Sequence, residues 1–231
     1  MTILNASMRR PTTPAVSAPA SQDWKTRSAC RGTPVDDFFS TSTAAKERAR
    51  ALCVGCPVIV ECLNNQRQSD DAIYRWGVGG GLDPDQRRAL DVEELLGNRP
   101  DMAMAQLLVS PRWLYRLRRL KTSCRSLEGM VAALRKDGLV VDEVTVRVAV
   151  WWSGGQGARM ARPARGDHRS WRARLRDDYT DVVVMLHKLG ARRADIAAYL
   201  GNPGTNGEKG VSEVLRAVAE KSAAAGVGLA A

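Results

Sequence analysis

The chain lacks the features that mark membrane, secreted and most catalytic proteins. No apolar run approaches the roughly 20 residues that a membrane-spanning helix needs, so we expect no membrane partner. Residues 1–22 lack the apolar core of a secretion signal, and we expect the protein to stay in the cytoplasm. A Ser/His/Asp set, a phosphate-binding loop and a dinucleotide fingerprint are also missing. The sequence therefore does not predict an enzyme.

Histidine and phenylalanine are scarce. The chain has only two histidines, His168 and His187, and they lie too far along the sequence from the main group of cysteines to predict a mixed Cys/His metal site. Phe38 and Phe39 are the only phenylalanines. These two rings either fill a small core or serve in binding.

Basic residues outnumber acidic ones, and the excess is uneven. The chain has 35 Lys and Arg against 25 Asp and Glu, a formal net charge of +10. Residues 1–90 carry a net charge of +3 and residues 91–231 a net charge of +7. Because phosphate contacts release condensed counterions, this excess indicates DNA as a partner of the second part. A solvated, arginine-rich surface without a ligand is the alternative.

Four of the five cysteines lie in one stretch, with the spacing C-x22-C-x2-C-x5-C: Cys30, Cys53, Cys56 and Cys62. In a reducing cytoplasm such clustering indicates metal or redox chemistry rather than disulfides. Structural zinc sites usually take two tight cysteine pairs, whereas irregular spacing suits an iron–sulfur cluster. Both remain open at this point, as does a thiol–disulfide oxidoreductase that uses Cys53 and Cys56. The isolated Cys124 is expected to be a small apolar residue.

The residues around these cysteines carry a resemblance to a known family. It rests on the cysteines together with Asp37-Phe38-Phe39, Cys53-Val54-Gly55-Cys56-Pro57-Val58 and Gly77-Val78-Gly79-Gly80-Gly81-Leu82. Residues 22–90 resemble a WhiB-like (Wbl) transcriptional regulator of actinobacteria and their phages. The family carries a tryptophan in its glycine turn where this chain has Gly79.

The resemblance implies a cofactor and a partner. It implies that Cys30, Cys53, Cys56 and Cys62 bind a 4Fe-4S cluster that is sensitive to oxygen and nitric oxide. It also implies that the domain docks on region 4 of the primary sigma factor of RNA polymerase. The residues implied for sigma contact are Phe38, Phe39, Trp76, Gly77, Val78, Gly79, Gly80 and Gly81.

Residues 99–121 have the pattern of a helix-turn-helix. Ser110-Pro111 are typical of a helix start, and the ten residues that follow hold several arginines between inward-facing leucines. Such a recognition helix reaches phosphates and guanine edges. The candidate DNA contacts are Ser110, Arg112, Tyr115, Arg116 and Arg119. An amphipathic surface helix without a ligand is the alternative.

A faint repeat of 52 residues follows. Leu134 and Gly138 recur as Leu186 and Gly190, and the later copy predicts the front half of a second helix-turn-helix, followed by a long loop over residues 202–210. Residues 141–152 are ambiguous, since alternating valines favour a strand and the repeat favours a helix.

Together these patterns predict a mainly α fold, in which a small helical four-cysteine domain precedes helix-turn-helix-like modules. The expected parts are a disordered arm (1–22), the iron–sulfur domain (23–90), a helix-turn-helix-like module (91–125), a helical module of uncertain type (126–153), an arginine-rich linker (154–176), a second helix-turn-helix-like module (177–220) and a flexible tail (221–231). We expect a redox- or nitric-oxide-responsive transcription regulator that acts on DNA, on sigma region 4, or on both. A zinc-stabilised DNA-binding protein without a sensing role is the main alternative.

Overall fold

The computed structural model describes residues 22–68, 76–124, 126–154 and 167–224. Over these residues the fold is mainly α, as the sequence predicts, and it contains no β-strand. The helices are η1 (Gln22–Arg27), α1 (Asp36–Phe39), α2 (Thr43–Cys53), α3 (Ile59–Gln68), α4 (Pro84–Leu95), α5 (Met102–Leu108), α6 (Pro111–Ser123), α7 (Leu127–Lys136), α8 (Glu143–Trp152), α9 (Trp171–Asp178), α10 (Thr180–Lys188), α11 (Arg193–Tyr199) and α12 (Thr205–Ala224). The arm at 1–21, the stretch 155–166 of the linker and the tail at 225–231 lie outside the described residues.

Helix α4 joins the cysteine-bearing part to the rest of the chain. It begins with a complete capping box, in which the Asp83 carboxylate accepts from the Gln86 N–H and the Gln86 side chain accepts from the Asp83 N–H. Pro84 fits the first helical position because its missing N–H would have no partner there. The Asp83 carboxylate also pairs with the buried Arg50 of α2, so one aspartate starts α4 and ties it to α2.

Helices α5 and α6 lie over the residues where the sequence predicts a helix-turn-helix. Asp101 caps α5, and Ser110 precedes Pro111 at the start of α6. Only Val109 and Ser110 separate the two helices, which suits a tight turn. Leu117 and Leu120 are buried on the inner face of α6.

The ambiguous residues 141–152 form helix α8, so the strand interpretation is wrong. The alternating valines mislead because α8 lies at the centre of its module and is buried on nearly every side. Arg147 is also buried there, and its guanidinium pairs with Glu93 of α4. An all-round apolar pattern indicates a central helix as readily as a strand.

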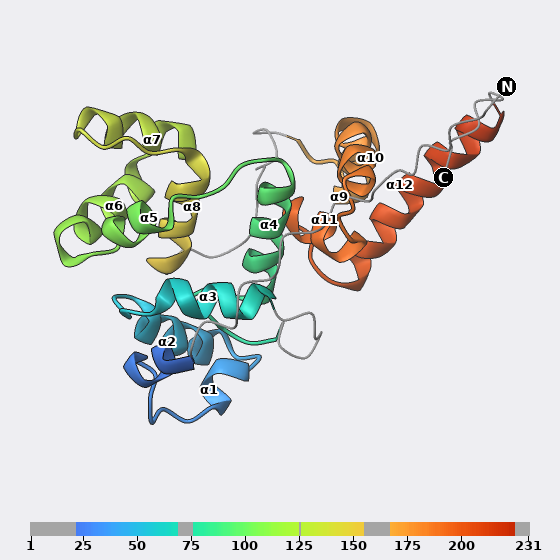
Figure 1. Ribbon diagram of the computed structural model, residues 1–231. Coiled ribbons are helices and arrows are strands. Elements are labelled where there is room, and N and C mark those ends of the chain that lie inside the picture. The colour runs from blue at the N-terminus through green and yellow to red at the C-terminus, as the bar shows by residue number, and fades with distance from the viewer. Residues whose placement is uncertain (1–21, 69–75, 125, 155–166, 225–231) are drawn as a thin grey trace, which may run out of the picture.

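Two hydrophobic cores organise the described part of the chain. The first core is continuous from the cysteine domain into α5–α8, since Ile59, Leu63 and Leu82 belong to the same cluster as Leu117 and Trp152. The second core lies within α9–α12 and includes Val92 of α4. Figure 1 shows α4 between these two groups of helices, with α1–α3 at one end and α12 projecting outward. Helix α4 therefore contributes to the packing of both groups.

The repeated residues occupy equivalent places at the ends of α7 and α10. Leu134 and Leu186 are fully buried, and Gly138 and Gly190 have φ values of +88° and +91°. In both copies the backbone N–H after the glycine donates to the repeated leucine carbonyl at 3.0 Å. This is the helix-ending arrangement that favours glycine, and it explains why leucine and glycine recur together.

Two expected irregular segments are partly helical. Helix α9 begins at Trp171, inside the expected linker 154–176, because Trp171 and Leu175 pack into the second core. Helix α12 begins at Thr205, so the expected loop 202–210 is wrong in its second half. Glycines suggested a loop, yet a Cβ on Gly210 would lie 2.6 Å from the Trp171 ring. The glycine allows close packing rather than a turn.

Candidate metal centre

The four clustered cysteines come from separate short elements. Cys53 is the last residue of α2, Cys56 lies in the following turn, and Cys62 is on α3. Cys30 lies in the turn after η1. The positive φ of Gly55, +78°, lets the chain reverse between α2 and α3. This tight turn places Cys53 and Cys56 between the end of α2 and the start of α3.

Electrostatic coupling among the four thiols indicates that they lie near one another. The pKa of Cys53 is raised to about 12, mainly by burial and in part by the charges of Cys62, Cys56 and Cys30. Burial likewise raises the pKa of Cys62, with Cys30 and Cys56 adding to the rise. Like charges raise one another's pKa only at short range. This coupling is consistent with the shared four-cysteine site that the spacing predicts.

Backbone N–H groups donate hydrogen bonds to the cysteine sulfurs, which stabilises negative charge on them. The Gly80 N–H donates to the Cys62 sulfur at 3.2 Å, and the Ala29 N–H donates to the Cys56 sulfur at 3.5 Å. A backbone hydrogen bond from Gly81 lowers the pKa of Cys53 against the effect of burial. Hydrogen bonds to ligand sulfurs are a means by which proteins tune iron–sulfur clusters. The donor set therefore fits a thiolate-ligated metal group.

A buried arginine adds positive charge beside this site. Arg87 of α4 is 3% exposed, and burial lowers its pKa to about 10. Its guanidinium interacts with Cys62 and donates to the carbonyl oxygens of Gly77 and Leu82 at 3.1 and 2.6 Å. Arg87 thus holds the glycine turn against α4 and offsets thiolate charge. Sequence analysis missed this residue because nothing in its local pattern sets it apart from Arg88.

The glycine turn is enclosed on both sides. Gly80 has φ of +57°, and a Cβ there would lie 2.4 Å from the Leu63 Cα. A Cβ on Gly81 would lie 2.6 Å from the Trp152 ring of α8. The Trp152 indole N–H donates to the Gly80 carbonyl at 2.8 Å, across 72 residues of sequence. Trp152 is another site residue that sequence analysis missed.

The residues implied for sigma contact separate into an exposed and a covered set. Trp76 is 70% exposed and Phe39 is 56% exposed, while Phe38 is half-buried. Gly77 is close to both phenylalanines, since a Cβ there would lie 3.0 Å from the Phe39 ring and 2.5 Å from the Phe38 carbonyl oxygen. The remaining members of the set are buried: Val78, Gly79, Gly80 and Gly81.

Gly79 lies against α3. A Cβ there would lie 2.7 Å from the Gln66 side chain. A larger residue at this place therefore needs the flexible Gln66 side chain to move.

The candidate DNA contacts on α6 also differ in exposure. Arg112, Tyr115 and Arg119 are exposed, and Tyr115 reaches 71%. Arg116 instead pairs with Asp137 at the end of α7, at 2.7 Å. The Ser110 hydroxyl is buried, so it does not face solvent as a DNA contact requires. Arg118 and Lys121 are exposed on the same helix and were not among the predicted contacts.

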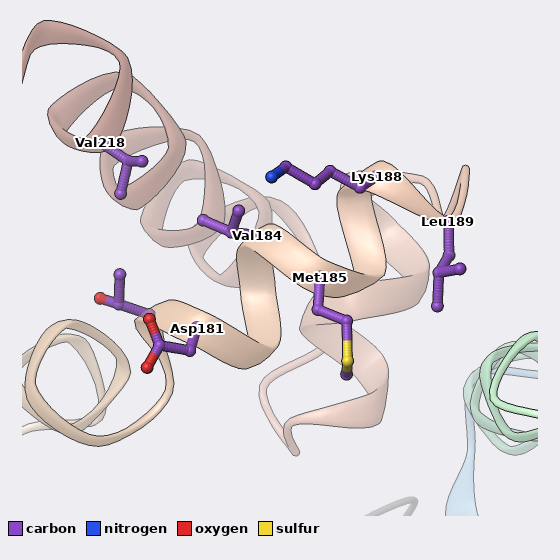
Figure 2. A pocket seen from close by; sticks show the side chains of 7 residues that line it. Asp181, Val184, Met185, Lys188, Leu189 and Val218 are labelled. Carbon is purple, nitrogen blue, oxygen red and sulfur yellow. The ribbon is translucent and has the colours of Figure 1, made fainter. Parts of the chain in front are cut away.

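Other features of the described residues lie apart from this centre. Cys124 follows α6 and is half-buried against the first core. A groove with a volume of about 520 Å³ lies between α10 and α12. Figure 2 shows Asp181, Val184, Met185, Lys188 and Leu189 on the α10 side, with Val218 across from them on α12. Within the described residues, no group of three or more Cys, His, Asp or Glu side chains is arranged to hold a single metal ion, and no helix is long and apolar enough to cross a membrane.

Comparisons with known proteins cover the cysteine-bearing part. The family model described as transcription factor WhiB matches residues 24–90. The chain is 34% identical over 71 residues to the transcriptional regulator WhiB2 of Mycobacterium tuberculosis, which covers 31% of this chain and 76% of the relative. It is 34% identical over 90 residues to WhiB1 of Bifidobacterium longum, which covers 37% and 95%. It is 33% identical over 67 residues to WhiB of Streptomyces coelicolor, which covers 29% and 74%.

No solved structure matches the chain. The matched region includes all four clustered cysteines and the glycine turn that Arg87 and Trp152 hold in place. The family match and the coverage of these relatives agree with each other. This chain belongs to the WhiB family of transcription factors.

Proposed function

We propose that the protein is a transcription regulator that holds a 4Fe-4S cluster through Cys30, Cys53, Cys56 and Cys62. The observation that carries the proposal is the mutual coupling of four thiols beside backbone donors and a buried arginine. Four thiolates concentrate negative charge, and the N–H groups of Ala29 and Gly80 together with Arg87 oppose it. When bound, such a cluster supplies redox chemistry and reactivity toward oxygen and nitric oxide.

Zinc with the same four ligands is the second candidate. Thiolates suit zinc as well, but structural zinc sites usually draw on two tight cysteine pairs. This chain offers one such pair, Cys53 and Cys56, and two separate ligands. The spacing therefore favours the cluster over zinc.

Helix α6 supports DNA as a partner. Its sequence contains no acidic residue, and its exposed side chains include Arg112, Arg118, Arg119 and Lys121. By contrast, α12 mixes acidic and basic residues along its exposed face. We infer that α6 is the helix that contacts DNA, with the exposed Tyr115 beside the arginines. Arg116 forms an ion pair with Asp137 and is therefore not assigned to DNA contact.

The exposed aromatic residues of the cysteine domain support a protein partner. Trp76 and Phe39 are large apolar side chains left in solvent next to Gly77. Exposed aromatic anchors of this kind dominate the binding energy of many interfaces. Region 4 of the primary sigma factor is the partner that the family resemblance implies. We assign its contact to Trp76 and Phe39 rather than to the buried glycines.

Single Cys→Ser substitutions test the cofactor assignment. In protein purified without oxygen, serine at position 30, 53, 56 or 62 is expected to remove or strongly reduce the visible absorbance of the cluster. Cys124→Ser is the matched control and is expected to keep it, because Cys124 lies after α6 and is not among the thiols whose charges raise the pKa of Cys53 and Cys62. Equal loss in the Cys124 variant contradicts the assignment.

A further inference from the structure

Gly80 links the thiol site to helix α8. Its N–H donates to the Cys62 sulfur at 3.2 Å, while its carbonyl oxygen accepts from the Trp152 indole at 2.8 Å. One residue is thus fixed by a candidate ligand on one side and by α8 on the other. A displacement of Cys62 therefore acts directly on Gly80, whose carbonyl oxygen accepts from the Trp152 indole.

The packing around this link leaves little space to absorb such a displacement. Leu63, the neighbour of Cys62 on α3, lies against Gly80, and the Trp152 ring lies against Gly81. Trp152 itself is 1% exposed. Close-packed interiors transmit displacements because they have few voids. The turn is therefore a mechanical contact between α3 and α8 as well as a hydrogen-bonded one.

Helix α8 in turn supports the helix-turn-helix. Helix α5 packs along α8, and the Asp101 N–H at the start of α5 donates to the Thr145 hydroxyl at 2.8 Å. Leu117 of α6 belongs to the same core as Trp152. The position of α8 thus sets the position of the helices that we assign to DNA binding.

The second group of helices is attached in another way. It meets the cysteine domain through α4, where Val92 enters the second core and Arg88 approaches Asp195 at 3.8 Å. Its Trp171 donates its indole N–H to the Leu200 carbonyl at 3.2 Å, within its own module. Trp171 is a matched control, since it is also a packed tryptophan bonded to a backbone carbonyl.

We propose that Trp152 is a positioning residue that couples ligation of the four thiolates to the DNA-binding helices α5 and α6. The inference rests on the proposed function. With ligands fixed, Cys62 and Gly80 hold Trp152 and α8 in place. Without them, α3 and the glycine turn lose a constraint, and α8 loses its support at Trp152. By linkage, DNA that binds the supported arrangement also favours ligation of the thiolates.

The first test follows the indole N–H resonances of the full chain by NMR, before and after anaerobic removal of the metal group by a chelator. The Trp152 resonance is assigned in the wild type from its contacts with Gly80. We expect it to shift or broaden on removal, while that of Trp171 stays in place. An unchanged Trp152 resonance overturns the inference. Equal changes at both tryptophans also overturn it, because the group then merely holds the whole chain together.

The second test measures binding to duplex DNA, with and without the metal group, in the wild type, Trp152→Phe and Trp171→Phe. Phenylalanine keeps an aromatic ring but removes the N–H donor. We expect removal to weaken binding about fivefold or more in the wild type and in Trp171→Phe, within the usual range of allosteric coupling. In Trp152→Phe the ratio of the dissociation constants for DNA without and with the metal group is expected to fall toward one. An unchanged ratio in Trp152→Phe contradicts the role of its indole.

The visible absorbance of the starting material separates the two proposals. If the wild type shows no cluster absorbance, the proposed function fails and the inference fails with it. If the absorbance is present but Trp152 does not respond, only the inference fails.

Discussion

Gly80→Ala is the substitution that most directly tests the account of the glycine turn. Gly80 has φ of +57°, and an added Cβ would lie 2.4 Å from the Leu63 Cα and 2.6 Å from the Leu63 nitrogen. A Cβ at positive φ alone costs about 1–2 kcal/mol. Because both neighbouring atoms belong to the backbone of α3, the strain cannot be relieved by a side-chain rotation. The turn or the helix has to move.

That movement breaks specific contacts, and their loss sets the expected magnitude. The hydrogen bonds at stake are those of Gly80 with Cys62 and Trp152, at 3.2 and 2.8 Å. A hydrogen bond contributes about 1 kcal/mol net to stability. With the backbone strain, Gly80→Ala is expected to lower the free energy of unfolding by about 3–4 kcal/mol. It is also expected to speed loss of visible absorbance in the presence of a chelator.

Gly97→Ala is the matched control. Gly97 follows α4 with φ of +85°, and a Cβ there would meet no atom within 4 Å. It therefore carries only the backbone strain of about 1–2 kcal/mol. Both variants are compared with the wild type by denaturant unfolding of the full chain under anaerobic conditions. Equal destabilisation by the two substitutions, with equal cluster retention, refutes the reasoning about Gly80.

Three further variants test other parts of the structure. Arg112→Ala with Arg119→Ala is expected to weaken DNA binding and to reduce its salt dependence by about two phosphate contacts, whereas an unchanged salt slope in a filter-binding assay excludes these side chains as phosphate contacts. Arg147→Met leaves the buried Glu93 carboxylate without its arginine and is expected to cost about 3–5 kcal/mol in denaturant unfolding; a cost below about 1 kcal/mol contradicts the importance of the pair. Trp76→Ala is expected to weaken binding of sigma region 4 by about 2 kcal/mol, roughly thirtyfold, without loss of visible absorbance. Unchanged affinity in a titration removes Trp76 from the interface.

Local patterns predicted the helix starts. Pro84 and Pro111 stand at helix starts because the first helical N–H needs no partner, and this can be read from sequence. The proposed grouping of the four clustered cysteines likewise rests on a spacing that short turns can bring together. Helix starts and cysteine spacing can be predicted because the residues that determine them are close together in the sequence.

Long-range packing was not predictable in the same way. The valines of α8 alternate as in a strand, and only the surrounding helices explain why α8 is buried on nearly every side. Trp152 reaches Gly80 across 72 residues, and no local pattern indicates that pairing. Arg116 has the spacing of a DNA contact, yet Asp137 from the next helix pairs with it. Gly207 and Gly210 suggested a loop but allow close helix packing.

The central claim is that four thiolates of this chain hold a 4Fe-4S cluster, and metal analysis tests it most directly. The full chain is purified without oxygen, and its iron, zinc and acid-labile sulfide are counted together with its visible spectrum. The account predicts about four iron and four sulfide per chain, with a brown colour that fades on exposure to air or nitric oxide. About one zinc per chain in colourless protein, without sulfide, would contradict it.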